Sequence, residues 1–268
     1  MTAAEDRFRS GDLQGSLAEL QSEVRRRPAD AKLRVFLAQL LTLTGDWDRA
    51  LNQLQVAGEL DAEALPMKHT YTAAIQCERL RTAVFGGERS PLVFGDPQPW
   101  IALLLQSLTV AAQGRADEAE ALRERALEEA PATAGTLNGT EFEWVADADS
   151  RLGPILEVLL NGAYYWVPFA RISRIQFEKP TDARDLVWIP AQFTWSNAGE
   201  AMGLVPVRYP GSERSPEDAI RMSRKTEWRP LGGDAFAGLG QRILTTSAAE
   251  LGVLDIREMT FADGSWRS

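Results

Sequence analysis

A 34-residue repetition in the first half of the chain is the feature that most constrains its fold. Gly11-Asp12 and Gly45-Asp46 lie 34 residues apart, and Gly114 stands 69 residues after Gly45, two such periods plus one. A 34-residue unit of two antiparallel helices is typical of tetratricopeptide arrays. Because one helical pair cannot bury its apolar face alone, neighbouring pairs must stack. The sequence therefore predicts an N-terminal tetratricopeptide-like helical superhelix.

The residues between the second and third copies break this period. Met67 to Phe85 is predicted to form one further helix, and Trp100 to Gln113 the first helix of the third unit. Residues 86–100 read GGERSPLVFGDPQPW, and this glycine- and proline-rich composition favours a loop or an extended insertion.

Arrays of this type present a concave face that is lined by the first helix of each unit. Such a groove can take a helix or an extended peptide from another protein. The alternative is that its apolar residues only pack against neighbouring helices or the second domain. By repeat position, the residues expected on this face are Lys32, Val35, Gln39, Leu43, Ile101, Leu104 and Leu108.

A small, polar segment at residues 134–140 is the natural domain boundary. We predict a helical domain over residues 1–136 and a β-rich domain over residues 137–268. Past the boundary, short aromatic and β-branched runs separated by turn residues predict a mainly antiparallel sheet, curved or forming a partly open barrel. The predicted fold class is α+β. The candidate strands are 164–168, 171–177, 185–189, 192–195, 202–208, 239–246 and 253–261.

Residues 146–169 join the two architectures. The apolar residues of Leu152–Leu160 recur at helical spacing, so we expect a short helix there. Asn161-Gly162 then supplies a helix stop or a turn. The aromatic run that follows favours a strand in which Tyr164 and Trp166 share one face.

Three further local signals lie in the second half. Ser215 before Pro216 predicts the start of a helix that continues to Arg224. Pro210-Gly211 is typical of the centre of a type II turn. The two glycines of GLGQR (238–242) lack the third glycine of a nucleotide loop, so a tight turn or bulge is the better interpretation.

The most unusual polar cluster is Asp147, Asp149 and Arg151. Two carboxylates at i and i+2 can begin an oxygen-ligand metal site. The calcium-loop pattern fails here, because Arg151 takes the third ligand position and Leu152 the glycine position. We therefore expect no metal site, and expect the carboxylates to pair with an arginine of the second half. The candidates are Arg171, Arg174, Arg184 and Arg208.

A second hypothesis gives this cluster a chemical role. In that case the β-rich half is a small-ligand-binding or enzymatic domain that uses Asp147, Asp149 and Arg208. Charged residues cluster in structural ion-pair networks as well as in active sites. The sequence pattern is therefore compatible with both the structural and the chemical role of this cluster.

Composition excludes several functions. A net charge of −9 (29 basic minus 38 acidic residues) argues against a nucleic-acid-binding surface. One histidine and one cysteine provide too few ligands for a thiolate or imidazole zinc site. No apolar run approaches the roughly 18 residues of a membrane span, and the N-terminus does not resemble a signal peptide. We therefore expect a cytoplasmic protein with no cofactor and no catalytic activity.

Six segments of the sequence together carry a family resemblance. They are ADADSRLGPILE (146–157), YYWVPF (164–169), RDLVWIPA (184–191), PVRYPGSE (206–213), SRKTEW (223–228) and GLGQR (238–242). The chain resembles the ImpE family, also called TagJ or SciE. This resemblance implies a tetratricopeptide-like N-domain joined to an α+β C-domain. It also implies a cytoplasmic, non-enzymatic accessory protein of bacterial type VI secretion, whose partner is the N-terminal helix of the small sheath subunit, TssB.

Overall fold

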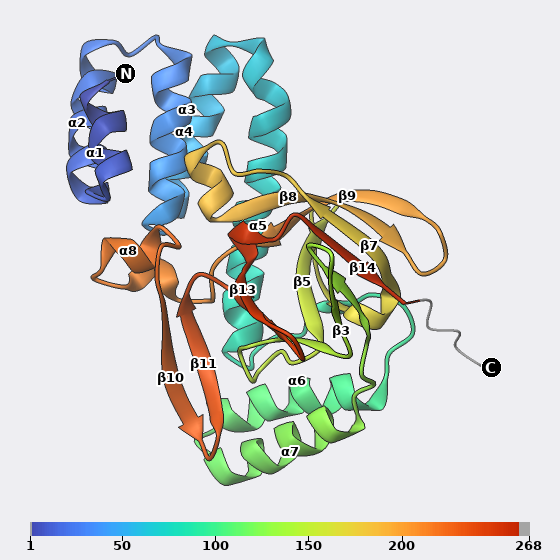
Figure 1. Cartoon of the computed structure of the whole chain (residues 1–268). Coiled ribbons are helices and arrows are strands. Elements are labelled where there is room, and N and C mark those ends of the chain that lie inside the picture. Colours follow the sequence, from blue (N-terminus) through green and yellow to red (C-terminus); the bar gives the residue numbers. More distant parts are fainter. Residues whose placement is uncertain (1, 263–268) are drawn as a thin grey trace.

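The computed structural model describes residues 2–262, in which a helical half precedes a β-rich half (Figure 1). Three antiparallel helical pairs, α1–α2, α3–α4 and α6–α7, follow the three predicted repeat copies. A single long helix, α5, separates the second pair from the third, as its sequence predicts. The helices are α1 Ala3–Ser10, α2 Leu13–Arg26, α3 Ala31–Leu43, α4 Trp47–Leu60, α5 Leu65–Phe85, α6 Pro99–Ala112 and α7 Ala116–Glu129, with a short α8, Asp218–Arg221, in the second half.

The glycine that recurs in the repeat has a structural cause. Gly11, Gly45 and Gly114 adopt positive φ angles of 92°, 69° and 78° in the turns between paired helices. Only glycine enters this left-handed region without steric cost. The carboxylate of Asp12 then caps α2 by accepting a hydrogen bond from the Gly15 amide at 2.7 Å.

The second half is built on an open nine-stranded sheet with the order β1-β6-β5-β9-β8-β7-β14-β2-β3. Its pairings are antiparallel, apart from the parallel pair β1–β6. The end strands β1 and β3 do not pair with each other in the described chain, so no barrel closes. The predicted α+β class, with a mainly antiparallel curved sheet, is confirmed. The strands are β1 Leu92–Val93, β2 Gly135–Leu137, β3 Thr140–Phe142, β5 Ile155–Leu160, β6 Ala163–Pro168, β7 Ile172–Phe177, β8 Trp188–Trp195, β9 Glu200–Pro206 and β14 Glu258–Phe261.

Two smaller sheets complete this half. One has the order β13-β12-β4, from Glu250–Gly252, Ile243–Thr246 and Val145–Asp147. The other is a hairpin of β10, Thr226–Gly232, and β11, Ala235–Gly240. The tip of this hairpin reaches α7 (Figure 1), where Gly233 lies against the Glu120 side chain.

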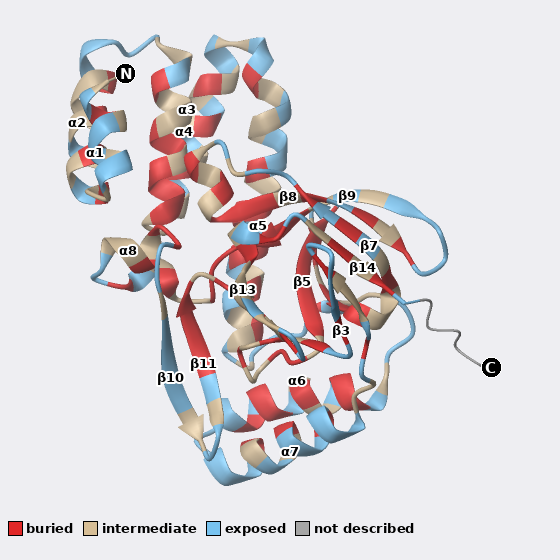
Figure 2. Cartoon of the chain, in the orientation of Figure 1, coloured by how far each residue is buried: buried red, intermediate tan, exposed pale blue. Residues whose placement is uncertain are grey.

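The expected helix over Leu152–Leu160 is wrong, because Ile155–Leu160 forms strand β5. Its residues alternate between two cores. Ile155 and Leu159 belong to the core shared with the helical half, and Leu156, Val158 and Leu160 to the core of the β-rich half. Figure 2 shows β5 buried along its length. A strand covered on both faces is apolar almost throughout, so its sequence does not show the alternation of a half-exposed strand.

Other local predictions are corrected in detail. The candidate strands 185–189 and 192–195 form one strand, β8, which begins at Trp188 after a 3-10 turn. The helix predicted from Ser215 to Arg224 is only Asp218–Arg221, and its N-cap is Glu217. Residues 239–246 divide between β11 and β12. The segment proposed as a domain boundary contains β2, and the boundary itself stays a prediction.

Two Asn-Gly turns close hairpins of the large sheet. Asn161 and Gly162, with φ of 50° and 77°, connect β5 to β6, and Asn138 and Gly139, with φ of 49° and 85°, connect β2 to β3. Positive φ at both central residues is the geometry of a type I′ turn. The turn alternative for Asn161-Gly162 is therefore the correct one.

Substitutions at two glycines test how closely the end of β11 approaches the backbone of Lys225. Gly139 and Gly240 both have positive φ, but an added Cβ meets nothing at Gly139 and lies 1.9 Å from the Lys225 carbonyl oxygen at Gly240. We expect Gly139→Ala to lower the free energy of unfolding by about 1 kcal/mol, from backbone strain alone. Gly240→Ala should cost about 2 kcal/mol more, because the backbone must also move. Equal losses in urea titrations would contradict this close approach.

Candidate functional site

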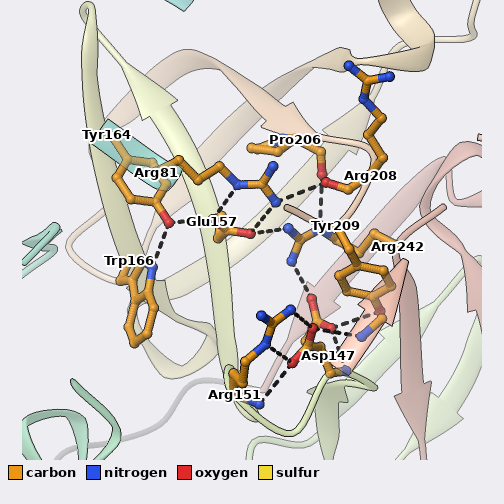
Figure 3. A network of polar contacts seen from close by, with 12 residues as sticks. Arg81, Asp147, Arg151, Glu157, Tyr164, Trp166, Pro206, Arg208, Tyr209 and Arg242 are labelled. Atoms are coloured by element: carbon orange, nitrogen blue, oxygen red, sulfur yellow. Dashed lines mark hydrogen bonds and ion pairs between the residues drawn. The ribbon is translucent and has the colours of Figure 1, made fainter. Parts of the chain in front are cut away.

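The carboxylate of Glu157 lies at the centre of a buried polar network (Figure 3). It sits on β5, on the face turned toward α5, and its side chain is fully buried. Arg81 of α5 donates from Nε to Oε1 and from Nη2 to Oε2, both at 2.7 Å. This two-point pairing is the strongest geometry for an arginine and a carboxylate. It links the helical half directly to the central sheet.

Arg242 lies on the other side of Glu157 and is also fully buried. Its guanidinium contacts both Glu157 and Asp147, while its Nε donates to the Pro206 carbonyl at 2.9 Å. The hydroxyl of Tyr164 donates to Glu157 as well. Glu157 is thus surrounded by donors from three separate parts of the chain, and Arg242 joins it to the sequence-predicted cluster.

The predicted cluster is internally paired. Asp147 accepts hydrogen bonds from the Tyr209 hydroxyl at 3.0 Å and from the Asp149 amide at 2.8 Å. Asp149 accepts from Nε of Arg151 at 2.8 Å and from the Gly238 amide at 2.9 Å. Both carboxylates are buried, and groups of the protein supply these donors.

Arg208 does not meet this cluster. It is buried, and its guanidinium donates at 2.7 Å each to the carbonyls of Thr42, Leu43 and Arg221. Thr42 and Leu43 end α3, and the carboxyl end of a helix favours a positive charge. Arg208 therefore holds the helical half to the β-rich half at a second point.

Arginines of the second half do pair with the two carboxylates, but the four named candidates are wrong. Arg174 pairs with Glu258 and Arg184 with Asp182. Arg171 lies beside Asp96. Asp147 and Asp149 instead take Arg242 and Arg151, because β12 pairs with β4 and brings Arg242 next to Asp147.

Burial and charge act in opposite directions on these groups. Burial would raise the pKa of Glu157, but the guanidinium groups of Arg81 and Arg242 lower it to about 2. Burial raises the pKa of Asp147 to about 6, although Arg242 opposes the rise. Burial lowers the pKa of Arg208 to about 10. At neutral pH all three groups remain charged.

This network has the properties of a structural link. Its carboxylates are paired with arginines, and the hydroxyls of Tyr164 and Tyr209 donate hydrogen bonds to Glu157 and Asp147. Among residues 2–262, no group of three or more His, Cys, Asp or Glu side chains has an arrangement that holds a metal ion. Every helix in the same part of the chain is too short or too polar to span a bilayer.

The residues predicted to bind a partner divide into two sets. Lys32, Val35 and Gln39 lie on α3 and line a surface cavity of about 520 Å³ that faces residues 180–186. The other four are buried in the helical core, where a partner would reach them only if that core opened. These are Leu43, Ile101, Leu104 and Leu108.

A larger cavity, of about 690 Å³, lies on a different face. It is formed by the first turns of α5, the β5–β6 turn and β9. Met67 and Tyr71 contribute apolar surface to it, and Met202 is 57% exposed beside them. The chain therefore offers two separate grooves in which helices meet the sheet.

Sequence reasoning missed the residues at the centre of the network: Arg81, Glu157 and Arg242. Glu157 had a signal, since it is the one charge within the apolar run ILEVLL. Arg242 was assigned only to a glycine-containing turn. Arg81 lies in an ordinary amphipathic helix, and nothing in its local sequence marks it.

These features define a two-part α+β protein in which a tetratricopeptide-like array is joined to an open sheet by buried ion pairs. Residues 139–260 match the family described as ImpE protein. The chain is 48% identical over 258 residues to the type VI secretion system accessory component TagJ of Pseudomonas aeruginosa, covering 96% of this chain and 90% of that protein. It belongs to this ImpE/TagJ family.

A solved structure shares the whole fold. The crystal structure of protein VPA1032 from Vibrio parahaemolyticus superimposes with a TM-score of 0.88 at 25% sequence identity. The match covers 97% of this chain and 98% of the other. The arrangement of the helical array against the sheet therefore occurs in both proteins.

Removing the central carboxylate tests the network. We expect Glu157→Gln to lower the free energy of unfolding by about 3 to 5 kcal/mol, because Arg81 and Arg242 would both stay buried with one carboxylate partner fewer. The matched control is Glu258→Gln, since Arg174 and Glu258 are 48% and 42% exposed and water screens their pair. Equal effects of both substitutions in urea titrations would contradict the central role of Glu157.

The lowered pKa of Glu157 makes the stability of the protein depend on pH. Because the pKa of Glu157 is about 2 in the folded protein and 4.5 unfolded, its contribution is complete above pH 4.5 and disappears as pH falls toward 2. The stability difference between wild type and Glu157→Gln should therefore shrink below pH 4.5. Urea titrations from pH 7 downward measure this difference, and a constant value would contradict the assignment.

Proposed function

We propose that this chain is an accessory component of a bacterial type VI secretion system. The observation that carries this proposal is the 48% identity to TagJ of Pseudomonas aeruginosa across nearly the full length of both chains. Such coverage includes the helical array, the sheet and the residues that join them. The proposed role is therefore that of the whole two-part protein.

Within this role, the chain binds the N-terminal helix of the small contractile-sheath subunit, in the cytoplasm and without catalysis. Two features support this. The polar network is occupied by its own ion pairs and holds the fold, which leaves no free carboxylate–arginine pair there for a substrate. A preformed array also loses little conformational freedom when a helix docks on it.

The cavity beside α3 is the groove that we assign to this partner. Val35 and Phe36 of α3 and Phe8 of α1 supply apolar walls, and Leu186 closes the opposite side. Lys32 stands exposed at the rim. The same cavity is also lined by charged residues such as Glu5, Arg9 and Asp182. Grooves that hold amphipathic helices offer apolar surface to one face of the helix.

A labelled peptide that carries the first helix of the sheath subunit tests both parts of the proposal. We expect saturable binding to the purified chain, weakened about tenfold or more by Val35→Asp, since an apolar contact would become a buried charge. Fluorescence anisotropy measures the affinity. Circular dichroism checks that the variant is folded.

Met202→Asp is the matched control, because Met202 lies in the separate cavity formed by α5 and β9. If Met202→Asp abolishes binding and Val35→Asp does not, the partner binds in the cavity beside Met202. The proposed sheath-binding function would then still hold. No saturable binding up to about millimolar peptide would overturn the sheath-binding function itself.

A further inference from the structure

A third cavity, of about 490 Å³, lies between the α6–α7 pair and the β10–β11 hairpin. It is separate from the sheath-helix groove, and the polar network touches it only through Arg151. Most of its walls are apolar, from residues such as Phe85, Leu108 and Leu231. Pockets that hold small molecules usually measure roughly 300 to 1,000 Å³ and combine such walls with a few polar groups.

Two arginines supply the polar groups. Arg123 of α7 lines the cavity and is only 5% exposed, yet its Nη2 atom is buried with no hydrogen-bond partner. Arg151 lines the same cavity, and Asp149 accepts from its Nε and Nη2. A buried guanidinium nitrogen without an acceptor is costly, because it has lost water and gained nothing in exchange.

Arg123 differs in this respect from the other buried arginines. Arg81, Arg208 and Arg242 each donate to carboxylates or carbonyls of the chain. Glu120 and Glu124, on the same helix, do not supply the missing acceptor at Nη2. Burial lowers the pKa of Arg123, although the carboxylates of Glu120, Asp149 and Glu124 act against this change.

We propose that this cavity binds a small organic carboxylate, with its charged end on Arg123 and Arg151 and its apolar body against Phe85, Leu108 and Leu231. The amino end of α7 forms part of the wall through Gly114 and Ala116, and α7 has no side-chain cap. The first turn of α7 already carries Asp117 and Glu118, so the arginines, and not this helix end, supply the charge that attracts the anion.

The available positive charge favours a carboxylate over a phosphate. Arg151 is already paired with Asp149, so Arg123 is the arginine left to neutralise an anion in this cavity. A carboxylate has two oxygens and one charge, whereas a phosphate carries about two charges and three strong acceptors. The mostly apolar walls also suit a hydrocarbon body better than a sugar or a bare inorganic ion.

Titration calorimetry of the full chain with octanoate tests this proposal. We expect saturable binding at or below about millimolar, weakened about tenfold or more by Arg123→Gln, because hydrogen bonds to charged groups exceed one tenfold step in affinity. The matched control is Arg125→Gln, since Arg125 is exposed on the same helix and pairs with Glu129. It should leave octanoate affinity unchanged.

Stability measurements separate a binding role from a structural one. Arg123→Gln removes a buried charge at a nitrogen that has no partner, so we expect thermal stability equal to or above that of wild type. A large loss of stability would show that Arg123 holds the fold and would overturn the proposal.

Two further probes identify the ligand class. Octanol that binds as well as octanoate would show an apolar cavity with no role for the charge. Inorganic phosphate that binds more tightly than octanoate would show a different anion. Either result, or octanoate affinity that is equal in Arg123→Gln and wild type, would overturn the carboxylate assignment.

Discussion

The fold depends on a carboxylate held between two arginines that come from opposite parts of the chain. Glu157 enters from the sheet, Arg81 from the helical half, and Arg242 from the start of β12. Further ion pairs surround these three groups. Arg81 also contacts Glu78, Arg242 also contacts Asp147, and Arg151 pairs with Asp149. Because buried ion pairs add little net stability but are costly to break, their main effect is to fix how the two halves sit together.

The same joint is reinforced at the ends of the helices. The carboxylate of Asp218, from the second half, accepts from the Leu13 amide that begins α2 at 3.0 Å. Arg208 donates to the last carbonyls of α3, and Arg224 to the Phe8 carbonyl near the end of α1. Helix ends leave backbone groups without partners, which other residues must satisfy. Here the β-rich half satisfies them, so the array is not a free-standing module with exposed ends.

Local signals in the sequence predicted local structure well. The glycine turns, the turn at Asn161-Gly162 and the single helix α5 depend on neighbouring residues, which the sequence displays. Strand β5 was mistaken for a helix because both of its faces are buried, and that fact arises from the packing of α5 and the remaining sheet. The carboxylates at Asp147 and Asp149 were recognised, but Arg81 and Arg242 lie 76 and 85 residues from Glu157. No local pattern connects residues so far apart.

The role of a buried arginine depends on the groups that surround it. Arg81 and Arg242 lie inside the protein with carboxylates of the chain opposite them, and their charges hold the fold together. Arg123 is buried to a similar degree, but it borders a cavity and leaves one nitrogen without an acceptor. An unsatisfied buried donor lowers stability, so the fold gains nothing from it. The other buried arginines of the described chain, Arg81, Arg208 and Arg242, donate to groups of the protein. The buried Nη2 of Arg123 does not, so its missing partner is most simply a ligand.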